Sequence, residues 1–234
     1  QGSYTWSNSL DTSSKQIRGP GESNQTYSTQ NWLDPASEKG PSNFDVTHVF
    51  TFNYTVDLPG QNMAGAAGHV LGGWQLGGIV TLATGVAETL QLGYDNCRCL
   101  SGEIFGVSTT DNRPDLIAGG DSNPVLFDGR EPTAYFDTSQ FEPAPAGFHG
   151  NVGRNTLRIP GVSTFDFSLI KNTRLSEQAN LQFRAEFFNI FNRTNFGDPE
   201  TRLFLGPGRP GSPGRITSTT TTARQIQFGL KIAF

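Results

Sequence analysis

The segment 224–234 alternates strictly between apolar and polar side chains. A period of two is typical of a β-strand, in which successive side chains point to opposite faces of a sheet. A strand with one fully apolar face can have either of two environments, because that face either packs on another layer of protein or faces lipid. Which environment applies constrains the fold class of the chain more than any other feature. The apolar positions are Ile226, Phe228, Leu230, Ile232 and Phe234.

The same alternation recurs upstream, always bounded by Gly, Pro, Asn or Ser clusters. The segment 181–191 is the one ambiguous case, because Phe187 and Phe188 break the pattern near its end. No segment keeps a helical i, i+3, i+4, i+7 stripe, and 28 Gly and 14 Pro disfavour helices further. We therefore predict an all-β, antiparallel chain of about six long strands. The other five strands are expected at 3–9, 46–58, 73–84, 163–171 and 181–191.

The connections between these strands are very unequal in length. A short polar turn at 176–179 and a moderate segment after residue 58 contrast with three long polar stretches, 10–44, 86–162 and 193–222. If the last strand runs inward from outside the cell, alternating directions place every long connection outside. Outer-membrane barrels have this asymmetry, with short periplasmic turns and long extracellular loops. We expect the long loops to lack regular structure, which is unusual in a compact soluble domain.

Two architectures can accommodate the apolar faces. Eighteen Phe residues, strands long enough to span a bilayer and aromatics near strand ends favour a transmembrane β-barrel in the outer membrane. The alternative is a secreted or surface β-sandwich used for adhesion or carbohydrate binding. In that alternative, exposed loop aromatics would be the ligand platforms, namely Trp32, Tyr94, Tyr135 and Phe148.

Composition narrows the function classes. Charged residues make up 16% of the chain and the net charge is −4, which disfavours nucleic-acid binding. The longest apolar runs fall short of a transmembrane helix, although barrel strands need no such run. The sequence contains no Ser-His-Asp order, phosphate-binding loop or metal-ligand spacing. We therefore expect no enzyme activity, no catalytic residues, no metal and no cofactor.

Some polar residues have both a chemical and a structural interpretation. We interpret Arg184, Glu186 and Lys231 as ion pairs on the polar face of neighbouring strands, and Cys97 and Cys99 as a loop pair able to oxidise. A calcium loop would use the cluster Asp111, Asn112, Asp115 and Asp121, but these residues lack EF-hand spacing.

Several passages together resemble the C-terminal β-barrel of TonB-dependent outer-membrane receptors, in particular the Oar-like branch. The likeness covers nearly the whole chain in the family's order and is weakest at 86–131. The passages are 3–7 (SYTWS), 44–50 (FDVTHVF), 71–78 (LGGWQLGG), 150–155 (GNVGRN), 181–189 (LQFRAEFFN) and 224–234 (RQIQFGLKIAF).

The resemblance implies a barrel of about 22 strands around a plug domain, which takes up scarce ligands with energy from the inner membrane. Residues 1–234 would be the C-terminal part of that barrel, and we expect the chain to be a fragment without the plug, the remaining strands and a signal peptide. Its expected partners are outer-membrane lipid, the rest of the receptor, an unknown ligand, and TonB only through the missing N-terminal region. The resemblance also implies that the apolar positions of 226–234 are the assembly signal read by the barrel-assembly machinery.

Overall fold

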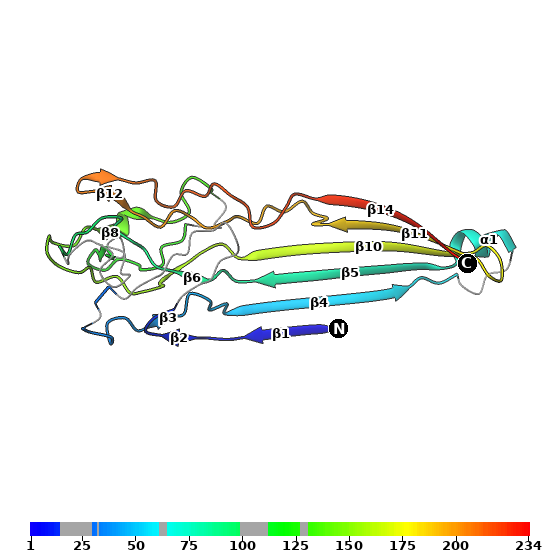
Figure 1. The fold of residues 1–234 in the computed structure, drawn as a ribbon, viewed down its shortest axis with the longest axis horizontal. Helices are drawn as coiled ribbons and strands as arrows, with labels where there is room; N and C mark the ends of the chain where they lie inside the picture. Colours follow the sequence, from blue (N-terminus) through cyan, green and yellow to red (C-terminus); the bar gives the residue numbers. More distant parts are fainter. Residues whose placement is uncertain (15–29, 32, 61–64, 99–111, 127–130) are drawn as a thin grey trace.

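The computed structural model describes residues 1–234 except 15–29, 32, 61–64, 99–111 and 127–130. Its main element is one six-stranded antiparallel sheet in which neighbouring strands follow one another along the chain (Figure 1). This confirms the predicted all-β architecture. The strands, in sheet order, are β1 (Gly2–Trp6), β4 (His48–Asp57), β5 (Trp74–Ala83), β10 (Val162–Arg174), β11 (Asn180–Phe188) and β14 (Gln225–Ala233).

The strand directions agree with the predicted asymmetry of the connections. The two shorter connections and the C-terminus lie at one end of the sheet, and all three long connections lie at the other (Figure 1). The sheet is open within the described residues, because β1 and β14 each pair with a single neighbour. By the length rule for outer-membrane barrels, the end with the long connections is the extracellular end.

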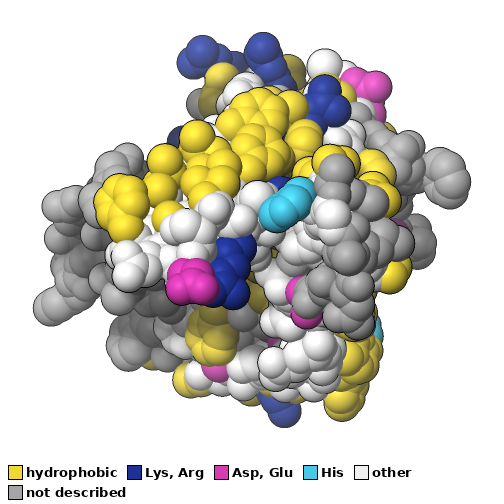
Figure 2. Space-filling model, turned by 90° about the vertical axis from the view of Figure 1, so that its right-hand side faces the viewer, with side chains coloured by type: hydrophobic (Ala, Val, Ile, Leu, Met, Phe, Trp, Pro, Cys, Tyr) yellow, Lys and Arg dark blue, Asp and Glu magenta, His cyan; other side chains and the backbone are white. Residues whose placement is uncertain are grey.

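The registers place the alternating apolar side chains of all six strands on one face, which we name the outer face. Residues paired across two antiparallel strands share a face, and the pairs are largely apolar. Figure 2 looks along the strands from the end that carries the C-terminus and shows hydrophobic side chains gathered across one side of the molecule. Representative pairs are Tyr4–Phe50, Phe52–Val80, Leu76–Leu169, Phe167–Phe187 and Phe183–Leu230.

In the described residues no second sheet covers the outer face, which leaves Phe228 67% and Leu230 68% exposed. The β-sandwich alternative is therefore wrong, because a sandwich buries this face. The opposite, inner face carries mainly Thr, Gln, Asn, Ser and charged side chains. Its larger apolar exceptions are Val49, Ile79, Val162, Ile170 and Phe188.

Three predicted strand ends are wrong by three residues. The first strand ends at Trp6 and not at residue 9, and β10 ends at Arg174 and not at residue 171. β11 ends at Phe188 and not at residue 191, because Asn189 and Asn192 adopt positive φ angles of 50° and 51°. Asparagine is one of the few residues that tolerate this left-handed region. The chain turns there, and the amide of Asn192 donates to the carbonyl of Asn189 at 2.8 Å.

A short helix, α1 (Gly65–Leu71), was not predicted in the connection between β4 and β5. Lys171 lies on the outer face of β10, and its ammonium donates to the carbonyls of His69 at 2.9 Å, Val70 at 3.1 Å, and Gly72. A cation is favourable at a helix C-terminus, where backbone carbonyls have no helical partner. The carbonyls at the end of the helix thereby stabilise the Lys171 ammonium, the one cation that β10 carries on its outer face. In the described chain, no helix is long and apolar enough to cross a bilayer.

The expectation that the long loops lack regular structure is wrong for their described parts. Four small antiparallel pairs and a 3₁₀ turn, η1 (Thr138–Gln140), order them. The pairs are β2 (Leu10–Asp11) with β3 (Gly40–Pro41), β6 (Ala87–Glu88) with β9 (Leu157–Arg158), β7 (Asp115–Leu116) with β8 (Phe141–Glu142), and β12 (Phe204–Gly206) with β13 (Arg209–Pro210).

A hydrophobic core explains this order. It lies among the long connections and not under the sheet, and it draws residues from two of them. We call the described parts of 7–47, 84–161 and 189–224 the loop assembly. Because its core excludes water, the loop assembly folds as a compact layer at the extracellular end of the sheet. The core residues are Leu90, Tyr135, Phe136, Phe141, Val152, Leu157, Leu203 and Ile216.

A charge placed on the outer face tests its contact with lipid. Leu230→Arg near the middle of β14 should destabilise the protein in phospholipid vesicles by about 2–4 kcal/mol, the usual cost of arginine at mid-bilayer on a barrel's lipid face. Gln227→Arg on the inner face of the same strand is the matched control and should change stability little. Denaturant unfolding followed by tryptophan fluorescence measures both, and equal effects of the two substitutions would contradict the assignment of the faces.

Candidate functional site

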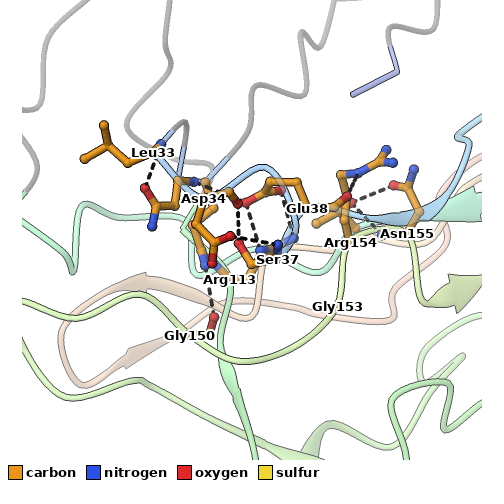
Figure 3. A network of polar contacts seen from close by, with 12 residues as sticks. Leu33, Asp34, Ser37, Glu38, Arg113, Gly150, Gly153, Arg154 and Asn155 are labelled. Atoms are coloured by element: carbon orange, nitrogen blue, oxygen red, sulfur yellow. Dashed lines mark hydrogen bonds and ion pairs between the residues drawn. The ribbon is translucent and has the colours of Figure 1, made fainter. Parts of the chain in front are cut away.

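The loop assembly is held together by buried arginines, of which Arg154 has the most partners (Figure 3). Its guanidinium is 3% exposed and ion-pairs with Asp11. It also donates to the carbonyl of Glu38 at 2.9 Å and to the hydroxyl of Ser14 at 2.9 Å. One side chain from the second long connection thus joins three points of the first.

Arg113 and Glu38 form a second buried tie between the same two connections. The guanidinium donates to both carboxylate oxygens, at 3.1 and 3.2 Å, and the two side chains are 4% and 1% exposed. Burial lowers the pKa of Arg113, and the Glu38 carboxylate opposes that shift. A bidentate geometry fixes both position and orientation, so the pair sets how these connections lie against each other.

The third tie lies within the loop assembly, next to its junction with the sheet. Arg158 contacts the carboxylate of Asp45 at 2.5 Å, just before β4 begins, and donates to the Asp45 carbonyl at 2.8 Å. The same carboxylate accepts from the Ser9 amide at 2.7 Å and from Thr47. Burial raises the pKa of Asp45, but the hydrogen bonds from Arg158, Ser9 and Thr47 outweigh it and hold the pKa below its ordinary value.

The segment 150–155 is inserted between the other loops. Asn155 adopts a φ of 53°, and its side chain bonds to Thr89 at 2.6 Å and to the Pro41 carbonyl at 2.7 Å. A Cβ at Gly150 would lie 2.1 Å from the Arg113 carbonyl, so only glycine fits there. The sequence thus allows close backbone approach at one end of the segment and polar ties at the other.

These ties specify an arrangement more than they add stability. Buried ion pairs recover little net free energy because their desolvation is costly, whereas removing one partner costs about 3–5 kcal/mol. The loop assembly is therefore preorganised, and its surface presents side chains at fixed positions. Apolar side chains exposed on it include Leu33, Phe44, Phe148 and Leu205.

The predicted loop aromatics have different environments. Phe148 is 66% exposed, as a ligand platform requires, and Tyr94 is half-buried. Tyr135 belongs to the loop core, so its prediction as an exposed platform is wrong. Its hydroxyl donates to the Arg158 carbonyl at 2.8 Å, and burial raises its pKa to about 12. Trp32 lies outside the described residues.

The residues predicted as an assembly signal share the outer side of the edge strand. All are half or more exposed, and they lie next to the unpaired edge of β14 in the described sheet. A row of alternate side chains beside free backbone groups is the geometry that β-augmentation uses. Their recognition by an assembly factor stays a prediction. The five residues are Ile226, Phe228, Leu230, Ile232 and Phe234.

The predicted neighbourhood of Arg184, Glu186 and Lys231 is confirmed, since β11 and β14 pair directly. Arg184 and Glu186 approach to 3.7 Å on the inner face, where both remain accessible to water. Exposed pairs of this kind contribute about 0–1 kcal/mol. They keep the inner face polar.

The remaining predicted polar groups are only partly described. Asp115 accepts from the Asn151 amide, 36 residues along the chain, and Asp121 accepts from the Asn123 amide within a local turn, so both carboxylates have structural partners. Asn112 is buried, and Asp111 lies outside the described residues. Among the described residues, no group of three His, Cys, Asp or Glu side chains is placed to hold a metal ion. Cys97 is disulfide-bonded, and Cys99 lies outside the described residues.

Sequence reasoning missed the buried ion pairs. Arg154 and Asp45 stand in passages that carried the family resemblance, but Asp11, Glu38 and Arg113 lie in long polar stretches without a periodic pattern. Charged residues make up only 16% of the chain, which is the one signal that could have drawn attention to them. Nothing in their spacing indicates which acid meets which base.

Acid should loosen the loop assembly at its junction with the sheet. The pKa of Asp45 is lower in the folded state, so its contribution is complete above the unfolded value of about 3.9 and is lost as the pH falls through the folded pKa. We expect the hydrogen-exchange protection of the Ser9 amide, corrected for intrinsic rates, to hold above about pH 4 and to fall as the pH drops further. Asp45→Asn should weaken protection at neutral pH and remove this step. Exposed Asp121→Asn, the control, should retain it; a step that survives in Asp45→Asn would contradict the assignment.

A comparison with protein-family models agrees with this architecture. The model described as "Outer membrane beta barrel domain" matches residues 1–227, which is almost the whole chain. Neither the search of curated proteins nor that of solved structures found a match. The strands, their lipid-facing outer side and this match lead to one conclusion: the chain belongs to the outer membrane β-barrel domain family and resides in the outer membrane.

Proposed function

We propose that the chain forms part of the wall of a TonB-dependent receptor, in the Oar-like branch, and that its loop assembly captures the ligand. The observation that carries the proposal is the packed, ion-paired loop assembly at the extracellular end of the sheet. A barrel that served only as a membrane anchor would not need so much ordered structure at its extracellular end. Preorganised loops lower the entropic cost of binding, which favours scarce ligands.

The inner face suits the wall of a filled barrel. Its water-accessible Arg184 and Glu186 and its many amide and hydroxyl groups can bond to water or to a polar plug. Such a lumen would pass a ligand without retaining it by apolar contact. This supports a transport path along the inner face.

The two edges of the sheet support a larger barrel. Unpaired backbone groups cost several kcal/mol each in hydrocarbon, and β1 and β14 each leave an edge free in the described sheet. We propose that other strands of the receptor cover these edges and that residues 1–234 are the C-terminal part of its barrel. The plug and the contact with TonB would then come from other parts of the receptor.

We propose that the chain acts by binding and conformational coupling and not by covalent chemistry. Its charged groups support this view, because the buried Arg113 and Arg154 and the partly exposed Arg158 are engaged with carboxylates in structural pairs. No cofactor is required in such a mechanism. The partners would be outer-membrane lipid, the rest of the receptor and an external ligand.

Uptake can be tested before the ligand is known. Cells with and without the gene, each with and without TonB, are grown in a defined rich medium, and the compounds they remove are measured by mass spectrometry. We expect at least one compound to be removed only when both proteins are present. Identical depletion in all four strains would contradict TonB-dependent uptake.

The loop assembly can then be tested in the same assay. Arg154→Ala leaves the partly buried Asp11 without its ion-pair partner and removes a donor to the buried Ser14 hydroxyl, so it should abolish most of the depletion while the protein level in the outer membrane stays unchanged. Exposed Arg209→Ala in β13 is the control and should behave as the wild type. Loss of depletion in both variants, or in neither, would contradict a specific role for the ordered loops.

The C-terminal side chains form a separate part of the proposal. We propose that Ile226, Phe228, Leu230, Ile232 and Phe234 are read by the barrel-assembly machinery. Phe234 is 97% exposed and contributes little to packing within the chain, so its deletion should spare stability but lower membrane insertion of the intact receptor several-fold. Heat-modifiable mobility on gels measures insertion. Replacement of Phe234 by Trp should retain it, and normal insertion of the deletion variant would contradict the role.

A further inference from the structure

The turn after β11 brings two arginines to the extracellular rim of the sheet. The Arg193 amide donates to the side-chain oxygen of Asn189 at 2.9 Å, and the Arg224 amide donates to that of Asn192 at 2.9 Å. These bonds join the exit of β11 to the entry of β14, where both strands meet the long connections (Figure 1). The two positive-φ asparagines therefore hold the backbone of residues 193 and 224 at the same part of the rim.

Both guanidiniums are available to an external anion. Arg193 and Arg224 are exposed, and neither takes part in an ion pair within the described residues. The side-chain contact of Arg224 is a long bond of 3.4 Å to the Ile190 carbonyl. This differs from Arg113, Arg154 and Arg158, whose charges carboxylates neutralise.

The neighbouring side chains place this pair at the margin of the outer face. Phe191 is 71% exposed and packs edge-to-face on Phe165 of the outer face, with ring centroids 5.1 Å apart. Arg224 lies two residues before Ile226, so the alternation of β14 puts it on the outer side. Arg224 thus continues the lipid-facing surface toward the extracellular medium, and Arg193 lies two residues after Phe191 at the same rim, where lipid headgroups lie.

We propose that Arg193 and Arg224 bind the phosphate of a phosphorylated lipid in the outer leaflet, while Phe191 contacts its acyl chains. Guanidinium is the side chain best matched to phosphate, which it binds through paired hydrogen bonds. A free phosphate ion would contact only the two guanidinium groups and not the Phe191 ring. An exposed ring next to two unpaired cations fits an amphipathic ligand, which brings anion and hydrocarbon together. The site lies on the outer side of the wall. The inference therefore does not depend on which ligand the loop assembly captures.

Lipid binding by the full chain in detergent micelles tests this inference. The probes are bisphosphorylated lipid A and the same lipid after phosphatase treatment, with affinity measured by thermophoresis and retained lipid counted by native mass spectrometry. We expect tighter binding of the phosphorylated form. Arg193→Gln and Arg224→Gln should each weaken it about tenfold, and the double variant more.

Three further variants separate a lipid site from general charge and from misfolding. Arg209→Gln, which removes an exposed charge far along the loop assembly, should bind as the wild type. Arg224→Lys should recover part of the affinity lost in Arg224→Gln. Phe191→Ser should weaken lipid binding although both arginine charges are retained. The proposal is overturned if the double variant binds lipid A like the wild type, if Arg209→Gln loses as much affinity, or if inorganic phosphate displaces lipid A at equal concentration.

Discussion

The backbone hydrogen bonds between the six strands are the interaction on which the rest of the structure depends. Inside a bilayer no water can replace them, so the chain must remain in long, registered antiparallel pairs. Once the registers hold, every second side chain must suit hydrocarbon. This requirement places Phe52, Phe167, Phe183 and Phe228 on one continuous face. It also explains why Lys171 directs its ammonium to the carbonyls at the end of α1.

The hydrophobic core lies in an unusual place as a consequence. The apolar side chains of the outer face contact lipid and do not form a core. The water-excluding core of the protein therefore forms among the long connections, around Phe136, Leu157 and Leu203. Buried ion pairs then fix the relative positions of these connections, and Arg158 with Asp45 fastens them to the start of β4. The wall and the loop assembly are therefore two layers with different solvents, joined through a few polar contacts at the strand ends.

Much of the wall could be predicted from the sequence, because alternation is a local property. It indicated the number of long strands, their directions and the face of each apolar residue. The end of β11 was missed because the positive-φ turn at Asn189 and Asn192 follows an apolar run that still looks like a strand. The loop assembly was missed for a different reason. Tyr135 and Arg154 have no periodic neighbours, and their burial depends on partners far along the chain.

The sequence by itself determined that this chain is a set of membrane-spanning strands, since a period of two and large apolar side chains are written into consecutive residues. Only the tertiary structure decided what lies beyond the membrane. The pairings of Arg113 with Glu38 and Arg154 with Asp11, and the bond from the Arg224 amide to Asn192, join segments that no local pattern connects. Such contacts form only when the strands bring the ends of all three long connections to the same rim.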